Sequence, residues 1–181
     1  MSAPVQVLPI SWQVIDLLVG KIVSLIGKDA AGVLATVRAM DHSQDPSPEM
    51  VYQLGNDLGD LLGADGAFAI VRQVGREIGR EFTDGKSREE ALRILEETLR
   101  HLGFAYRIEL DTEDAYICQC VFYELLERDG FGPIERPVCW AGWGFIEGSL
   151  ANISGAHHIT WAERDREGQR CRFRIKRVAL D

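Results

Sequence analysis

The side chains with the richest chemistry in this chain are four cysteines, all confined to residues 118–171. Cys118 and Cys120 flank Gln119, Cys139 opens a glycine-rich apolar stretch, and Cys171 follows Gly168 in an alternating segment. Thiolates bind soft metals, and four of them suit a zinc ion or an iron–sulfur cluster. The spacing therefore predicts a shared metal site, with zinc favoured over a cluster. The alternative, four thiols that fill a core, stays open because free cysteine is often buried.

Aromatic residues and glycines gather near Cys139. They could form the wall of a pocket for an apolar ligand, or they could be ordinary core residues. Glycines four apart on a helix clear one face for a close neighbour, which is either another backbone or a ligand. The candidate ligand-binding residues are Trp140, Trp143, Phe145, Phe131, Gly144 and Gly148.

Composition limits the classes of protein that this chain can belong to. The 181 residues are 46% apolar and carry a net charge of −8, which suits one acidic globular domain. Such a surface disfavours binding to nucleic acid or to anionic membranes. The first apolar run, 14–26, is too short to span a bilayer, and no basic region precedes it. We expect a cytoplasmic protein whose cysteines are thiols or ligands instead of disulfides.

Hydrophobic periodicity predicts helices first and strands later. Apolar residues recur at helical spacing before Gly103 and alternate with polar residues after it. Tyr116, Cys118 and Cys120 would share one strand face. This order predicts an α+β fold in which N-terminal helices pack on a small antiparallel sheet with one helix inserted between strands. The expected helices are 11–26, 30–40, 47–62, 64–82, 87–102 and 139–153, and the expected strands are 104–110, 116–121, 158–163 and 171–178.

The turn-rich segment 41–48 predicts a division of the chain into two parts. Residues 1–46 would be an arm and helices that serve dimerisation or act as a lid. Residues 47–181 would be the ligand-binding domain. The arginines of 164–177 are interpreted as a solvated strand face, because Arg170, Arg172 and Arg174 alternate with apolar residues.

Over residues 50–178 the pattern resembles the 4-vinyl reductase, or hydrocarbon-binding, domain family. The resemblance rests on Gly75-x-x-x-Gly79, a helix that ends near Gly103, and two strands. It continues with Pro137-Val138-Cys139, Gly144-x-x-x-Gly148 and Gly168-x-x-Cys171-x-Phe173. That family is related in fold to the sensor domains of phenol-responsive activators and to Golgi-transport tethering subunits.

The resemblance implies a dimeric α+β domain that holds a small hydrophobic or aromatic molecule beside a structural zinc. Cys139 and Cys171 match the family's ligands. Its middle cysteine is absent, since Arg164 and Asp165 stand there, and Cys118 and Cys120 are expected to take its place.

We therefore expect a non-catalytic small-molecule binding or sensing domain with a cysteine-rich metal site, forming a homodimer. One alternative is a redox protein or reductase component that acts on a tetrapyrrole-like substrate through a metal cluster. Whether the chain is an enzyme stays open, although it has no dinucleotide fingerprint and no clear acid–base constellation. The other alternative is an assembly or tethering module, which would expose a large apolar patch.

Overall fold

The computed structural model describes residues 11–27, 32, 35, 37, 39, 42–105, 107–111, 113–155 and 157–177. These residues form six helices and four strands, which confirms the predicted α+β fold. The helices are α1 (Trp12–Ile26), α3 (Pro48–Leu62), α4 (Ala64–Thr83), α5 (Arg88–His101), α6 (Val121–Arg128) and α7 (Pro137–Ser154). The strands are β1 (Arg107–Leu110), β2 (Asp114–Cys118), β3 (His157–Asp165) and β4 (Arg170–Arg177). The expected helix 30–40 lies mostly outside the described residues.

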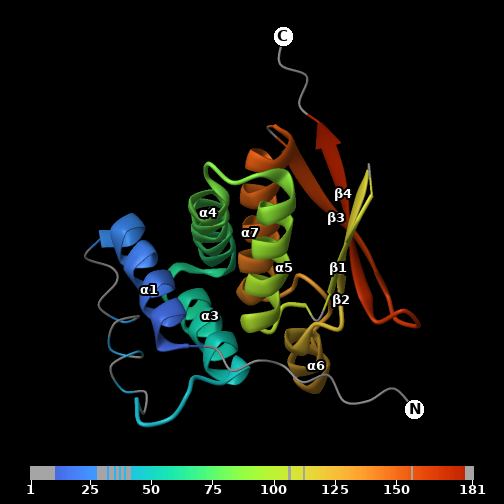
Figure 1. The fold of residues 1–181 in the computed structure, drawn as a ribbon. Helices are drawn as coiled ribbons and strands as arrows, with labels where there is room; N and C mark the ends of the chain where they lie inside the picture. The colour runs from blue at the N-terminus through green and yellow to red at the C-terminus, as the bar shows by residue number, and fades with distance from the viewer. Residues whose placement is uncertain are drawn as a thin grey trace.

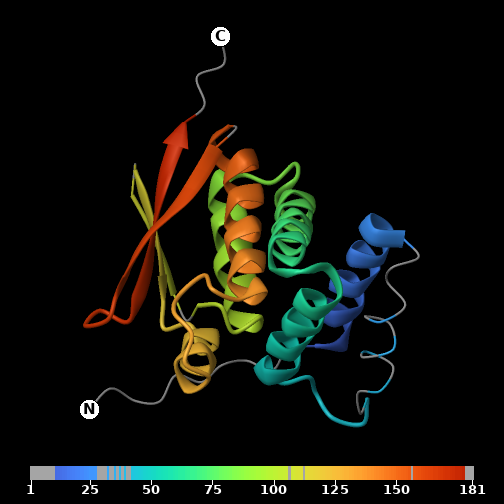
Figure 2. The same ribbon diagram turned by 180° about the vertical axis from the view of Figure 1, so that it is seen from behind.

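The elements are arranged in layers, with the sheet on one side of the molecule and α1 on the other (Figure 1). Helices α5 and α7 lie next to the sheet, α4 packs behind α7, and α1 and α3 form the outermost helical layer. The reverse view shows α6 below the sheet, beside the lower end of α7 (Figure 2). No described helix covers the outer face of the sheet in either view.

Local sequence signals explain where the helices begin. The Ser47 hydroxyl accepts a hydrogen bond from the Met50 backbone N–H at 3.3 Å, and Pro48 occupies the first turn of α3. The Ser87 hydroxyl accepts from the Glu90 N–H at 3.2 Å in α5, an arrangement typical of a serine three residues before a glutamate. Helix α7 likewise starts with Pro137. These starts fix the register of the helices that carry the candidate site.

The sheet is antiparallel with strand order β1-β2-β4-β3. Ile117 pairs with Cys171, and Ala115 pairs with Phe173, so these residues face the helices. Cys118 points the opposite way because side chains alternate along a strand. Gln119 then adopts a left-handed backbone with φ 59°, and Cys120 becomes the residue before α6. The prediction that Cys118 and Cys120 share a strand face is therefore wrong.

The N-terminal helix packs into the same hydrophobic core as the rest of the domain. Ile15, Val19 and Ile22 of α1 are buried together with residues of α3, α4 and α7. No helix among the described residues is long and apolar enough to cross a membrane.

Candidate functional site

The paired glycines bring α4 and α7 into direct backbone contact. A Cβ on Gly144 would lie 2.0 Å from the Arg72 carbonyl oxygen, and one on Gly148 would lie 2.1 Å from that of Arg76. From the other side, a Cβ on Gly75 would lie 2.2 Å from the Ala141 carbonyl oxygen. Real Cβ atoms do not approach so closely. The glycines thus face the partner helix, which is the packing alternative. Gly144 and Gly148 line neither of the two cavities described below, and their ligand contact stays a prediction.

The predicted aromatic residues form a layered stack beside this helix pair. The Trp140 and Trp143 rings lie 4.7 Å apart, and Trp140 also stacks on Phe68 at 5.0 Å. Both indoles are anchored, because Trp140 Nε1 donates to the Ile134 carbonyl and Trp143 Nε1 donates to the Ile159 carbonyl, each at 2.9 Å.

The other two predicted aromatic residues lie further from this stack. Phe145 is buried against Phe82, with ring centroids 6.3 Å apart. Phe131 lies in the loop before α7, where the Arg136 guanidinium sits 3.6 Å from its ring centre.

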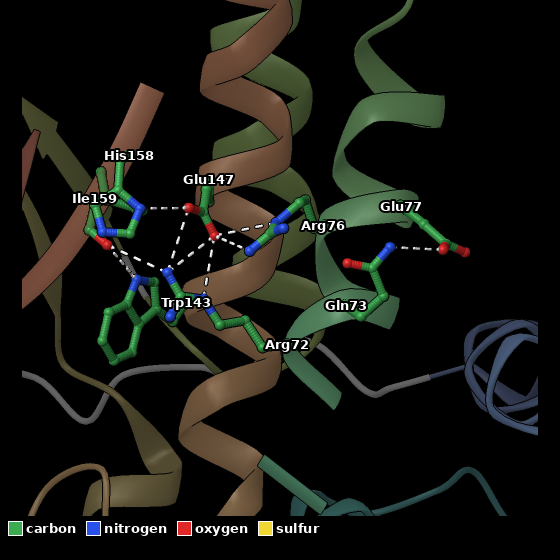
Figure 3. A network of polar contacts seen from close by, with 8 residues as sticks. All are labelled: Arg72, Gln73, Arg76, Glu77, Trp143, Glu147, His158 and Ile159. Carbon is green, nitrogen blue, oxygen red and sulfur yellow. Dashed lines mark hydrogen bonds and ion pairs between the residues drawn. The ribbon is translucent and has the colours of Figure 1, made fainter. Parts of the chain in front are cut away.

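A buried carboxylate fastens the same interface electrostatically (Figure 3). Glu147 of α7 has a side chain that is 6% exposed, and it accepts hydrogen bonds from Arg72 and Arg76 of α4. His158 of β3 lies 3.4 Å away from the carboxylate through its Nδ1. Arg72 also donates to the Ile159 carbonyl and lies 4.2 Å from the Trp143 ring centre. We call Glu147, Arg72, Arg76 and His158 the Glu147 cluster; it ties two helices and the edge of β3 together.

Three of the four cysteines surround one small cavity between the sheet, α6 and the start of α7. We call it the thiol cavity; its volume is about 30 Å³, and its lining otherwise consists of apolar and aromatic side chains. Phe173 connects its wall to the aromatic stack, because its ring lies 5.8 Å from that of Trp143. The lining residues are Phe104, Ile117, Cys120, Tyr123, Leu126, Pro133, Ile134, Cys139, Trp161, Cys171 and Phe173.

The thiols of this cavity are held in their protonated form. Burial raises the pKa of Cys139 to about 12, although the Ile134 backbone N–H partly opposes that rise. Burial also raises the pKa of Cys120, and the neighbouring Cys139 and Cys171 add to the effect. The pKa of Cys171 is raised by burial and partly lowered by Arg164 and Trp161. A protonated thiol is a poor nucleophile, so the cavity presents a neutral, polarisable surface instead of a reactive one.

The predicted zinc or iron–sulfur site is wrong. Within the described part of the chain, no group of three or more His, Cys, Asp or Glu residues could hold a metal ion. Cys118 lies on the outer sheet face beside Arg107, Glu109 and Arg170, in a groove away from the other cysteines. Cys120, Cys139 and Cys171 share a cavity, but they do not form a ligand set.

A second small cavity lies between α1, α3, α4 and α7. Its volume is also about 30 Å³, and aliphatic side chains and one glycine line it without a single ionisable group. We call it the aliphatic cavity. It resembles a gap in helix packing and offers nothing that could orient a ligand. Leu18 and Ile22 of α1 form part of its wall.

Sequence reasoning missed helix α6 and the position of Arg164. Helix α6 is only eight residues long, and its apolar residues gave no clear period. Arg164 was read as part of a solvated face, yet its Nη1 lies 3.6 Å from the Cys171 sulfur and its guanidinium lies 3.8 Å from the Tyr123 ring centre. The cause is a β-bulge between Trp161 and Glu163, which a sequence pattern does not reveal.

Comparisons with known proteins show which solved structures have a similar fold. No protein-family model and no curated protein matches the chain, so the resemblance to the 4-vinyl reductase family stays an expectation. A structure from work on heme distortion in the H-NOX family has a TM-score of 0.56 and 16% identity, covering 91% of this chain and 93% of that one.

Two further solved structures give the same result. An oxygen-binding H-NOX domain related to soluble guanylate cyclases has a TM-score of 0.51 and 13% identity, with 93% and 96% of the two chains covered. The phenol-responsive sensory domain of the transcription activator PoxR, with phenol, has a TM-score of 0.50 and 16% identity, with 82% and 90% covered. The chain therefore shares the fold of these domains.

The heme named for the H-NOX structures does not fit either of these two cavities. Heme iron needs an axial His, Cys, Tyr or Met, and the aliphatic cavity has none of these. The thiol cavity has thiols and a tyrosine, but its volume of about 30 Å³ is far below that of a porphyrin site. Histidines 42, 101 and 158 line neither cavity.

Proposed function

We propose that this protein is a non-catalytic small-molecule binding or sensing domain, and that its ligand is a small apolar or aromatic molecule held in the thiol cavity. One observation carries the proposal: this cavity combines aromatic walls with neutral thiols at the junction of the sheet, α6 and α7. The shared fold with H-NOX domains and the PoxR sensory domain supports it. A cytoplasmic location agrees with the presence of four free thiols.

The loop between α6 and α7, residues 129–136, is the expected entrance, and we call it the cavity loop. Pro133 and Ile134 line the cavity, and Ile134 has a left-handed backbone with φ 60°. A β-branched residue in this region carries strain of about 1–3 kcal/mol. The cavity as it stands holds little more than a water molecule. Binding of a larger molecule would therefore require this loop to move.

Titration with toluene tests the proposal, with calorimetry and tryptophan fluorescence as the two measurements of binding. Trp161 lines the cavity and Trp143 contacts its wall, so occupancy should change the emission. Filling the cavity with Cys171→Phe should abolish the toluene response. The milder Cys139→Met serves as a second filling variant if the first does not fold.

Ala141→Leu is the matched control, because it fills the aliphatic cavity from the same helix as Cys139. We expect it to leave toluene binding unchanged. Binding that is lost in Ala141→Leu but kept in both cysteine variants would move the ligand to the aliphatic cavity. No saturable binding of toluene to the unaltered protein would contradict the proposal.

The homodimer is also part of the proposal. Leu25 of α1 and Leu61 of α3 are large apolar side chains that are 41% and 43% exposed. We infer that the α1–α3 surface is the contact between two copies. Light scattering on the purified protein tests this, and Leu25→Lys should shift the mass toward that of the monomer.

A further inference from the structure

A β-bulge turns one arginine of the sheet toward the helices. Trp161 pairs with Phe173 and lines the thiol cavity, while Glu163 pairs with Arg172 and forms an ion pair with it on the outer face. Arg164 pairs with Cys171. In a regular strand, residues 161 and 164 would point to opposite faces. The extra residue at the bulge instead places both on the inner face, beside the thiol cavity.

Arg164 has no carboxylate partner among the described residues. Its contacts are the Cys171 sulfur at 3.6 Å and the Tyr123 ring at 3.8 Å, and its Nε is buried without a hydrogen-bond partner. The neighbouring arginines of β4 differ in having carboxylate partners, since Arg170 pairs with Asp165 and Arg172 pairs with Asp114. The Nε of Arg172 is also buried without a hydrogen-bond partner, so the missing carboxylate is what distinguishes Arg164. A guanidinium with an unused buried donor is costly, and the described residues supply no partner for it.

The carboxylates next to Arg164 in the sequence, and the one that shares its contact with Tyr123, form hydrogen bonds to other residues. Glu127 accepts a hydrogen bond from the Tyr123 hydroxyl at 2.7 Å. Glu163 and Asp165 bond to Arg172 and Arg170 on the outer face. These three carboxylates therefore do not pair with Arg164.

A second unused donor lies next to Arg164. The Trp161 indole N–H is buried, and by geometry it has no hydrogen-bond partner in the described part of the chain. It lies near enough to Cys171 to affect that thiol's pKa, yet a thiol sulfur is a weak acceptor. By contrast, the indoles of Trp140 and Trp143 both donate to carbonyls. Two unused donors, one of them cationic, thus lie beside Cys171, which lines the otherwise apolar cavity; Trp161 lines the cavity itself, and Arg164 contacts it through Cys171.

We propose that Arg164 and the Trp161 N–H recognise an acidic group, so that the ligand of the thiol cavity is an apolar or aromatic carboxylate, with Arg164 as the specificity-determining residue. This rests on the proposed function, because it names the class of molecule bound in that cavity. The carboxylate would accept hydrogen bonds from both donors, and the apolar body would contact Phe173 and the thiols. Each charge-assisted hydrogen bond contributes enough to change affinity by about tenfold or more.

The test compares benzoate with toluene, which have similar size and differ in the acidic group. Calorimetric titration of the whole chain at neutral pH should show benzoate binding at least about tenfold more tightly than toluene. Arg164→Met should reduce benzoate affinity by about the same factor and leave toluene affinity within about twofold. Trp161→Phe should weaken benzoate binding by a smaller factor.

Arg174→Met is the control, because Arg174 is an exposed arginine on the outer face of β4 and its loss changes the net charge equally. It should bind both probes as the unaltered protein does. If Arg164→Met does not fold, Arg164→Lys keeps the charge without the fork of donors and should retain part of the preference for benzoate. Toluene binding without any preference for benzoate, or full benzoate affinity in the Arg164 variants, overturns this inference and leaves the proposed function standing. Binding of neither probe overturns both.

Discussion

The α4–α7 interface and the thiol cavity both lie along helix α7, and each has an arginine against an aromatic ring. The two arginines differ in their hydrogen-bond partners. Arg72 lies 4.2 Å from the Trp143 ring centre and makes two hydrogen bonds to Glu147. Arg164 lies 3.8 Å from the Tyr123 ring centre, and the Cys171 thiol is its only acceptor among the residues that the structure describes. The first region has satisfied its charges, whereas the second keeps donors unused.

The α4–α7 interface is also more closely packed than the thiol cavity. At the interface, glycines let backbone touch backbone, so no space remains. At the cavity, thiols and rings leave a void under a loop with a strained Ile134. Close packing and paired charges favour a single rigid arrangement, while a void with unpaired donors is where a ligand can add stability. The comparison therefore separates scaffold from site within one helix, and the following predictions test it.

The largest effect is expected for Gly144→Ala. The new Cβ would lie 2.0 Å from the Arg72 carbonyl, so the helices would have to separate along their length. We expect a loss of about 3 kcal/mol in the free energy of unfolding, measured by urea denaturation. Gly20→Ala in α1 is the control, since nothing lies within 4 Å of its Cβ position, and it should be neutral or stabilising. Equal effects at both positions would contradict the close contact.

Glu147→Gln should have the next largest effect. The carboxylate is 6% exposed and receives hydrogen bonds from two arginines, which would lose their charged acceptor. We expect a loss of about 2 kcal/mol by the same measurement. Glu97→Gln, which breaks an exposed pair with Arg93, should cost less than about 0.5 kcal/mol. A Glu147 variant as stable as the Glu97 variant would show that the cluster contributes little.

The buried thiols of the thiol cavity should make the free energy of unfolding fall at alkaline pH. Below about pH 9 the Cys139 thiol is protonated in both states, whereas between about 9 and 12 only the unfolded chain ionises, because burial raises the folded pKa to about 12. Stability should then fall by about 1.4 kcal/mol per pH unit for this thiol. Cys139→Ala removes that contribution, so its stability relative to the unaltered protein should improve between pH 8 and pH 10. Parallel curves for the two proteins would argue against a buried neutral thiol.

The smallest effect is expected for Arg164→Met without ligand. Arg164 loses only a cation–π contact and a weak bond to sulfur, and the variant no longer places an unpaired charge beside an apolar cavity. The free energy of unfolding should change by less than about 0.5 kcal/mol. Arg72→Met should lose about 2 kcal/mol, because it breaks hydrogen bonds to Glu147 and Ile159. Similar losses in both variants would erase the distinction between scaffold and site.

Much of the fold could be predicted from the sequence because it depends on local sequence patterns. Ser47 and Ser87 mark helix starts that depend on neighbouring residues alone. The paired glycines indicated a helix face cleared for a close neighbour, which the structure shows to be another helix. Glu147 is an acid on an apolar helix, and the structure pairs it with Arg72 and Arg76. Its partners could not be named in advance, because they lie about 70 residues away.

The candidate site was less predictable because it depends on two departures from regular strand geometry. The left-handed Gln119 sends Cys120 into the cavity and leaves Cys118 outside it. The bulge near Trp161 brings Arg164 to the inner face. Strict alternation predicted four clustered cysteines and a solvated arginine, and both predictions failed at these single residues.

The glycine contact between α4 and α7 also decides how this protein can vary. Alanine is the smallest possible replacement at 75, 79, 144 and 148, and the carbonyl oxygens opposite leave no room for it. In a library that samples every substitution, folded variants should be nearly absent at these four positions. Many residues should be tolerated at the thiols, in the cavity loop and at Arg164. The domain could thus exchange one ligand for another by mutation on one side of α7 while the other side of the helix stays unchanged.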